Sequence, residues 1–189
     1  MSSKDTLAEY RSKRSRSGSA EPAGDSPASG GDGGRFVIQR HDASSLHFDV
    51  RLEIAGVLVS WAVPKGPSTD PRQKRLATRT EDHPLDYATF EGRIPAGDYG
   101  GGTVVVWDTG TFANDGDHDT QTALDRGHLR VRLDGHKLSG AYAFIHSRMR
   151  GDDSNWLMVK VDDGGADRRR NPATTQLESV LPGRRNEDL

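Results

Sequence analysis

The stretch Leu46-His47-Phe48-Asp49-Val50-Arg51-Leu52-Glu53 alternates apolar and polar side chains without a break. This alternation predicts a β-strand with one buried face, because successive side chains of a strand point to opposite sides. The polar face then carries His47, Asp49, Arg51 and Glu53. An imidazole, two carboxylates and a guanidinium on one face indicate either a solvated surface or a functional site.

About eight runs rich in β-branched and aromatic residues lie between Gly, Pro and Asp clusters, which is typical of an all-β domain. The predicted strands are Arg35–His41, Leu46–Glu53, Val57–Val63, Lys74–Thr80, Thr103–Thr109, His128–Leu133, Lys137–His146 and Trp156–Val161. Only Thr120–Arg126 is expected to form a short helix. Short antiparallel strands joined by tight turns favour a closed barrel or a sandwich, because closure removes exposed sheet edges.

The chain has 189 residues, enough for one ordinary domain, which we place at 35–161. Residues 1–34 are predicted to be a flexible arm, because Gly, Ser and Pro dominate from Ser15 to Gly34. Within the arm, the basic segment Leu7–Arg14 is interpreted as one or two helical turns, which form either a solvated tail or a phosphate-contacting arm. The polar tail at 162–189 is expected to fray.

Composition excludes several kinds of site. The chain has no cysteine, so any metal must be held by His and carboxylates. The N-terminus is polar and no run is long enough to span a bilayer, so no membrane partner is expected and a cytoplasmic protein is the default. The net charge of −2 means that binding to nucleic acid would have to be local.

His41 precedes His47 by six residues across the turn at 42–45, so a hairpin can bring the two imidazoles together beside Asp49. Two His and one Asp suit manganese, iron(II) or zinc, and three protein ligands leave positions open for water and substrate. Arg51 on the same face has a planar fork that matches phosphate oxygens, although an ion pair with Glu53 or Asp49 is the alternative interpretation.

Other polar residues are less specific on their own. His83 and Tyr87 lie in a loop shaped by Pro84, and Lys65 and Arg75 could add a phosphate-binding rim or serve only solubility. The glycine-rich segment at 91–102 lacks a P-loop ending and is interpreted as a turn that feeds the next strand.

Two rival functions stay open at this point. The motif His47-x-Asp49 with a distal His128 or His146 has the ligand set of an iron(II) oxygenase. A nucleic-acid-binding barrel whose basic arm follows a backbone without catalysis is the second rival.

Several segments resemble one known family, the 3′-phosphoesterase domain of bacterial DNA ligase D. They are Gln39–Glu53, Glu81–Tyr87, Phe90–Pro95 and Tyr99-Gly100, with weaker echoes at Trp61–Gly66 and Trp156–Lys160. The resemblance runs in order from Leu7 to about Lys160. It implies a compact antiparallel β-barrel with a manganese-dependent site. The implied activity removes a 3′-terminal ribonucleoside from a primer strand and then the 3′-phosphate, during DNA repair by end joining.

Carried over residue by residue, the resemblance assigns roles to positions of this sequence. The implied metal ligands are His41, His47 and Asp49. The implied catalytic positions, led by the phosphate clamp of Arg51 and His83, are His83, Arg51, Tyr87 and Glu81. The implied substrate-binding or supporting positions are Gln39, Lys65, Arg75, Arg14 and Glu21.

The arm departs from the family pattern at one position. An acidic residue follows the matching Arg in the family, whereas Ser15 follows Arg14 here, so the steps that depend on the arm, with phosphate removal as a candidate, are the part of the expected activity that the resemblance supports least. The implied partners are the 3′ ends of DNA or RNA/DNA primer–templates, together with a separate DNA ligase and other end-joining proteins. Since the sequence contains no polymerase or ligase module, we expect a free-standing version of the domain.

Overall fold

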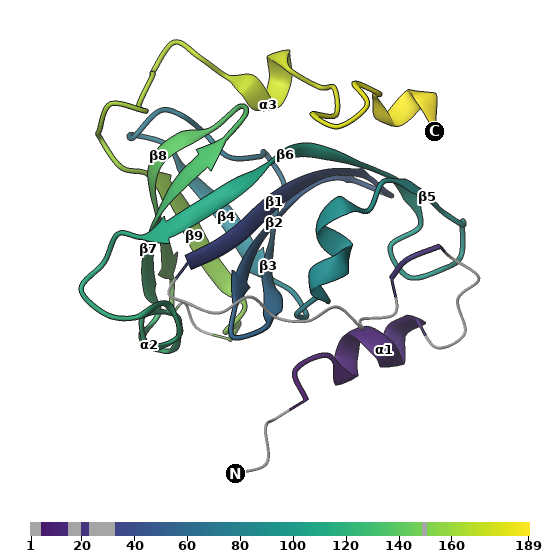
Figure 1. Ribbon diagram of the computed structural model, residues 1–189, viewed down its shortest axis with the longest axis horizontal. Coiled ribbons are helices and arrows are strands. Elements are labelled where there is room, and N and C mark those ends of the chain that lie inside the picture. The colour runs from purple at the N-terminus through teal and green to yellow at the C-terminus, as the bar shows by residue number, and fades with distance from the viewer. Residues whose placement is uncertain (1–4, 15–19, 23–32, 149–150) are drawn as a thin grey trace.

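A computed structural model describes residues 5–14, 20–22, 33–148 and 151–189 of the chain. Its elements in chain order are α1 (Ala8–Arg14), β1 (Gly33–Asp42), β2 (Leu46–Ile54), β3 (Val57–Val63), β4 (Lys74–Arg79), η1 (Leu85–Thr89), β5 (Gly92–Ile94), β6 (Gly102–Asn114), α2 (Thr120–Arg126), β7 (His128–Gly135), β8 (Ser139–His146), β9 (Asn155–Lys160), α3 (Pro172–Thr175) and η2 (Asn186–Asp188). Figure 1 shows the strands wrapped into one barrel, with α1 beside it.

The barrel closes because β1 pairs with β2 on one side and with β6 on the other. The order around the barrel is β1-β2-β3-β4-β9-β8-β7-β6, and every pair in it is antiparallel. The short β5 is a ninth strand that extends the sheet from the Gly102 end of β6. The predicted antiparallel barrel of about eight strands is therefore confirmed.

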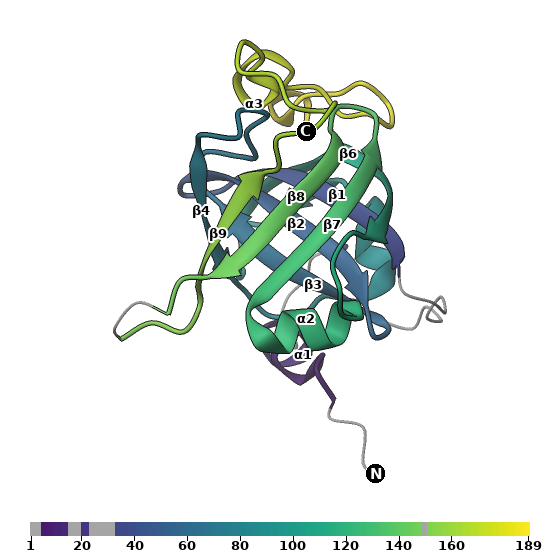
Figure 2. The same ribbon diagram turned by 90° about the vertical axis from the view of Figure 1, so that its left-hand side faces the viewer.

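The main hydrophobic core fills the inside of the barrel. On β2 the side chains of Phe48, Val50 and Leu52 belong to this core, as the alternation of the sequence predicts. α2 contributes Ala123 and Leu124 and lies across one end of the barrel, while the segment that carries α3 lies across the other (Figure 2). The interior is consequently a packed core, and the polar face of β2 lies on the outside of the wall.

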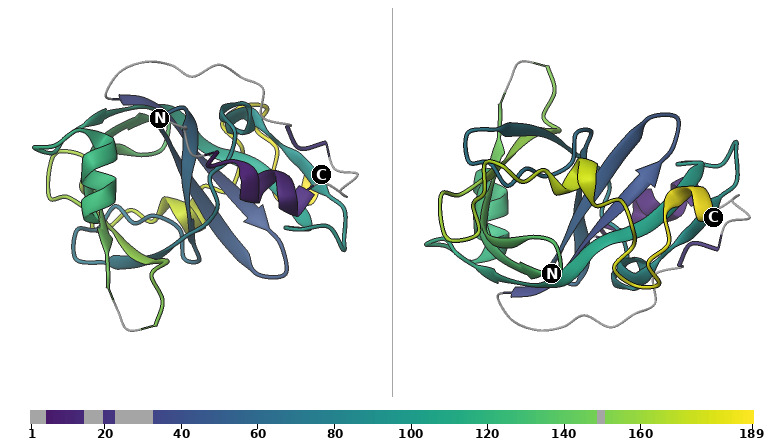
Figure 3. Two further views of the ribbon diagram at one scale, coloured as in Figure 1. Left: turned by 90° about the horizontal axis from the view of Figure 1, so that it is seen from below. Right: turned by 90° about the horizontal axis from the view of Figure 1, so that it is seen from above.

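A second hydrophobic cluster covers part of that outer wall. It joins Val37 of β1 and Leu58 of β3 to Leu85 and Tyr87 of η1 and to Tyr10 of α1. The left view of Figure 3 shows α1 in front of the strands and to one side of α2. This outer layer forms a floor and a side wall around the polar face of β2.

The predicted helix Thr120–Arg126 has the observed bounds of α2. Asp119 accepts a hydrogen bond from the backbone N–H of Thr122, and Gly127 ends the helix with a φ of 79°. The predicted strands are found with small shifts at their ends, except that β6 runs on to Asn114 and β5 was not predicted. Within the described residues, no helix combines the length and apolar character that a membrane crossing needs.

The expectation that the tail after Val161 frays is wrong. This segment packs along the barrel, where Ala173 joins the core and the Asn186 side chain is 2% exposed. The Asn186 amide donates to the carbonyl oxygens of Arg40 and Thr103 at 3.1 and 2.9 Å. Polar composition misled the prediction, because hydrogen bonds to the barrel hold this segment in place.

The basic segment forms α1 as interpreted, and it is not a solvated tail, since Tyr10 is 2% exposed. Most of the predicted linker from Ser15 to Gly34, with Ser15 itself, lies outside the described residues.

Candidate active site

His41, His47 and Asp49 converge near the turn at 43–45 that joins β1 to β2. His41 and His47 are directly paired across the two strands, and Gln39 is paired with Asp49. The Asp49 Oδ2 atom lies 3.4 Å from His41 Nδ1 and 3.3 Å from His47 Nε2. One atom from each of the three side chains falls within 4.8 Å of the others, which suits a shared metal ion.

The outer nitrogens of both imidazoles are held by backbone carbonyls. His41 Nε2 donates to the Gly100 carbonyl oxygen at 2.7 Å, and His47 Nδ1 donates to that of Ser45 at 3.1 Å. In the neutral rings, His41 Nδ1 and His47 Nε2 therefore carry lone pairs that face the Asp49 carboxylate. Three electron-pair donors that face one another require a cation between them, either a proton or a metal ion.

The pKa shifts of His47 and Asp49 also indicate that positive charge is favoured between these side chains. Burial disfavours the imidazolium of His47, but the hydrogen bond and charge of Asp49 outweigh it and raise the pKa of His47. Burial also disfavours the Asp49 carboxylate, but the charge of Arg51 and the two His side chains hold the pKa of Asp49 well below its usual range. Asp49 is thus a carboxylate anion at neutral pH.

Arg51 is fixed beside this group of ligands. Its Nε donates to Gln39 Oε1 at 2.7 Å and its Nη1 to Ser60 Oγ at 2.9 Å, while Nη2 lies 3.5 Å from Asp49 Oδ2. The guanidinium also lies over the Tyr87 ring, 4.9 Å from the centroid. Because Nε and Nη1 are bonded to Gln39 and Ser60, Nη2 is the nitrogen that Arg51 directs into the pocket.

Gln39 supports Arg51 from inside the wall. Its amide donates to the carbonyl oxygens of Tyr87 and Phe90 at 2.9 and 3.1 Å, and its side chain is fully buried. Gln39 therefore acts on the site through Arg51 and η1.

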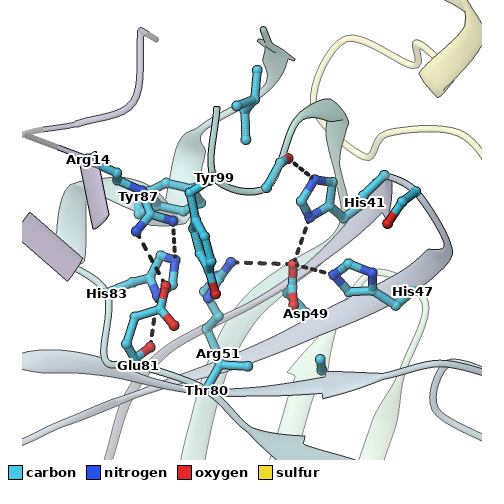
Figure 4. Close-up of a pocket in the computed structure, with 15 residues that line it drawn as sticks. Arg14, His41, His47, Asp49, Arg51, Thr80, Glu81, His83, Tyr87 and Tyr99 are labelled. Atoms are coloured by element: carbon cyan, nitrogen blue, oxygen red, sulfur yellow. Dashed lines mark hydrogen bonds and ion pairs between the residues drawn. The ribbon is translucent and has the colours of Figure 1, made fainter. Parts of the chain in front are cut away.

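His83 lies on the opposite side of Arg51 from the three metal-ligand candidates (Figure 4). Its Nδ1 donates to the carbonyl oxygen of Glu81 at 2.9 Å, and its Nε2 lies 3.4 Å from Arg14 Nη2. Burial, with the charges of Arg51 and Arg14, holds the pKa of His83 well below its ordinary value. His83 is consequently neutral at pH 7, with the lone pair of Nε2 on the side of Arg14.

α1 contributes cations to the pocket from across the outer layer. Arg14 donates to Glu21 at 3.0 Å and to Glu81 at 3.3 Å. The same Glu21 oxygen accepts a hydrogen bond from the Tyr87 hydroxyl at 2.9 Å. Arg14 thereby lies at the pocket with its charge partly balanced by two buried carboxylates.

Arg14, Arg51, Glu81, His83 and Tyr87 line one pocket of about 250 Å³ with the three metal-ligand candidates. Gln39 and Glu21 do not line this pocket but bond to residues that do: Gln39 to Arg51, and Glu21 to Arg14 and Tyr87. Lys65 and Arg75 are not among the described residues that line the pocket: Lys65 is exposed, and Arg75 is bonded to Gln73.

Sequence reasoning missed several residues that shape this pocket. Ser60 holds Arg51, Gly100 orients His41, and Tyr99 and Lys13 meet at the rim. Gly100 and Tyr99 had a signal, since both occur in a segment that resembles the family, and Lys13 lies in the basic segment Leu7–Arg14; Ser60 had none.

The oxygenase alternative required His128 or His146 as a third ligand. These residues lie on β7 and β8, and neither belongs to the described residues that line the pocket. The trio that does converge uses His41 instead.

The comparison with known protein families gives one match. The sequence model of the DNA ligase D 3′-phosphoesterase domain matches residues 39–146, which include the last four residues of β1, all of β2 and every described residue that lines the pocket except Arg14.

Curated relatives agree with this match. The chain is 51% identical over 167 residues to the multifunctional non-homologous end joining protein LigD of Pseudomonas aeruginosa, covering 88% of the chain and 20% of the relative. It is 48% identical over 157 residues to the multifunctional non-homologous end joining DNA repair protein LigD of Mycobacterium tuberculosis, covering 83% and 20%. For the Mycolicibacterium smegmatis protein the identity is 41% over 164 residues, covering 84% and 21%. The chain thus spans about a fifth of the length of these relatives.

Proposed function

The chain belongs to the family of the DNA ligase D 3′-phosphoesterase domain, and from this premise we propose that it heals the 3′ ends of primer strands during DNA end joining. It removes a terminal ribonucleoside and then the 3′-phosphate that remains. One observation carries the proposal: a pocket in which an immobilised guanidinium stands beside two imidazoles and a carboxylate that require a cation. The proposed partner is a DNA ligase, since the relatives are named as end-joining proteins.

His41, His47 and Asp49 would hold a divalent metal, which we propose to be manganese. Imidazole and carboxylate ligands without thiolate suit this ion. A divalent ion held there supplies positive charge to a phosphoryl oxygen of the substrate. The carbonyls of Gly100 and Ser45 fix the rings before binding, so little reorganisation is needed.

Arg51 and Arg14 bind the nonbridging oxygens of the phosphate. Because Gln39 and Ser60 occupy Nε and Nη1 of Arg51, the guanidinium cannot turn away from the pocket, and Nη2 stays directed at the substrate. Donors that are fixed before the reaction stabilise charge that develops in the transition state at little cost.

His83 donates a proton to the leaving oxygen. In the hydrolysis the oxygen of water forms a bond to phosphorus and releases one proton to the solvent. The bond from phosphorus to the leaving oxygen breaks, and that oxygen takes up a proton from His83. The leaving oxygen is the 5′-oxygen of the ribonucleoside in the first reaction and the 3′-oxygen of the primer in the second. Burial is the largest cause of the low pKa of His83, and the charges of Arg51 and Arg14 add to it. A bound phosphate offsets those two charges and places an anion beside His83, so His83 can gain a proton and donate it.

The test uses primer–templates that end in a 3′-phosphate or in one ribonucleotide, with manganese and separation of the products on a gel. We expect His41→Ala and Asp49→Ala to abolish both reactions, because each removes one of three metal ligands. His128→Ala, which removes an exposed imidazole outside the pocket, is the matched control and should retain activity. Undiminished phosphate release by His41→Ala would overturn the assignment, and manganese titration by calorimetry checks the binding directly.

A further inference from the structure

Tyr99 is a large aromatic side chain that the described structure leaves open to solvent at the rim of the pocket. It lies in the loop between β5 and β6, and 48% of its surface is exposed. It lines the same pocket as Arg51 and His83. An exposed aromatic ring beside an anion-binding pocket is typical of a surface that contacts a ligand.

The ring is held in one orientation by α1. Lys13 Nζ donates to the Tyr99 hydroxyl at 3.1 Å and lies 4.5 Å from the ring centroid. Arg14 Cζ lies 5.4 Å from the same centroid. Lys13 is itself anchored by ion pairs to Glu9 at 2.9 Å and Glu81 at 3.1 Å. An exposed side chain with this many contacts is fixed before any ligand binds.

Figure 4 shows the Tyr99 ring standing in front of Arg51, with His83 and Arg14 on one side and the metal-ligand candidates on the other. A phosphate bound by Arg51 and Arg14 would therefore place its attached nucleoside near this ring. Nucleobases stack on aromatic side chains whatever their sequence, because every base has a π face.

We propose that Tyr99 stacks on the base of the nucleotide that bears the 3′-phosphate, so that the preferred substrate is a 3′ end whose last base is unpaired. This proposal rests on the proposed function and adds a substrate preference, namely a 3′ end whose last base is unpaired. A base that remains stacked and paired in a duplex would first have to be unpaired, which costs free energy, whereas a mismatched base is released more easily.

The test compares primer–templates that carry a 3′-phosphate and differ only in the last nucleotide, which is paired, mismatched or abasic. For the mismatched end, Tyr99→Leu should raise KM by about tenfold, from the loss of base stacking. For the abasic end, the same variant should match the wild type. Tyr99→Phe keeps the ring and loses only the hydrogen bond from Lys13, so it is the matched control and should stay within about twofold on the mismatched end.

A binding measurement separates this proposal from the proposed function. A primer whose last base is 2-aminopurine is titrated with protein in the presence of a chelator, and stacking on Tyr99 quenches its fluorescence. We expect quenching with the wild type and Tyr99→Phe and its loss with Tyr99→Leu, even if no phosphate is ever released. Equal quenching of 2-aminopurine fluorescence by all three proteins would overturn the proposal. So would a rise in the KM of Tyr99→Leu that is the same for the abasic and the mismatched ends.

Discussion

Replacing Gln39 with Leu removes one amide that serves three buried groups. The Gln39→Leu variant leaves the Phe90 carbonyl and Arg51 Nε without these partners, while the Tyr87 carbonyl keeps only the backbone N–H of Phe90, at 3.0 Å. A buried group left without its partner costs ~1–3 kcal/mol, and more when it is charged. With ~1 kcal/mol for the Phe90 carbonyl and ~2 kcal/mol for the guanidinium, the free energy of unfolding should fall by ~3 kcal/mol. The melting temperature should fall by roughly 6–12 °C.

The same substitution should affect catalysis although Gln39 does not reach the substrate. Arg51 keeps Ser60 but loses its tightest contact, the 2.7 Å hydrogen bond from Nε. A guanidinium displaced by a fraction of an ångström should lower kcat/KM by about tenfold to hundredfold. Urea unfolding and phosphate-release kinetics measure the two effects.

A matched control is Thr69→Val. The Thr69 side chain is 1% exposed, and its hydroxyl lies within hydrogen-bond distance of the Asp167 and Arg170 carbonyls, outside the pocket. This variant should lose ~1 kcal/mol of stability with unchanged kinetics. If Gln39→Leu loses less than about 1 kcal/mol, or keeps the wild-type kcat/KM, the amide is not what holds Arg51.

Two further predictions concern the loop and the pH dependence. Gly100 has a φ of 77°, where a side chain strains the backbone, and its carbonyl oxygen holds His41 Nε2 at 2.7 Å, so Gly100→Ala should weaken manganese binding in calorimetry by about tenfold. Gly97→Ala is the matched control, because Gly97 has a φ of 95° but does not line the pocket with the metal-ligand candidates; equal manganese affinity for both variants would contradict the role of the Gly100 carbonyl. His83 has a pKa below its unfolded value of about 6.5, so the unfolded state takes up the proton first and stability should fall with pH below that value, by up to ~1.4 kcal/mol per pH unit. The measurement is the free energy of unfolding in urea from pH 7 to 5. It should change less with pH in His83→Phe than in the wild type, and an identical pH dependence of the two proteins would refute the assignment.

Local patterns were enough to predict most of the barrel. The alternation of Leu46–Glu53 indicated which face of β2 is buried, because a strand with one wet face has a period of two. The hairpin spacing brought His41 to His47, as their direct pairing shows. Each of these inferences depends on residues that are close in the sequence.

Contacts between distant segments could not be predicted in this way. The C-terminal segment is polar in composition, which predicts fraying. It is nevertheless held against β6, because the backbone N–H of Val180 donates to the carbonyl of Val106 at 2.9 Å. Lys13 of α1 reaches Glu81 and Tyr99 across more than sixty positions of sequence. β5 has only three residues, too few for a period to appear. Such contacts depend on the fold as a whole.

The position of the pocket on the outer face of β2 has a consequence for folding fidelity. A slip of β2 by one residue would send Phe48, Val50 and Leu52 into the polar layer and His47, Asp49 and Arg51 into the hydrophobic interior. Burying three ionisable groups there without partners would cost far more than the marginal stability of a domain. The apolar side chains of β2 therefore act as a check on assembly: a molecule that completes its barrel has also placed its functional groups on the correct side.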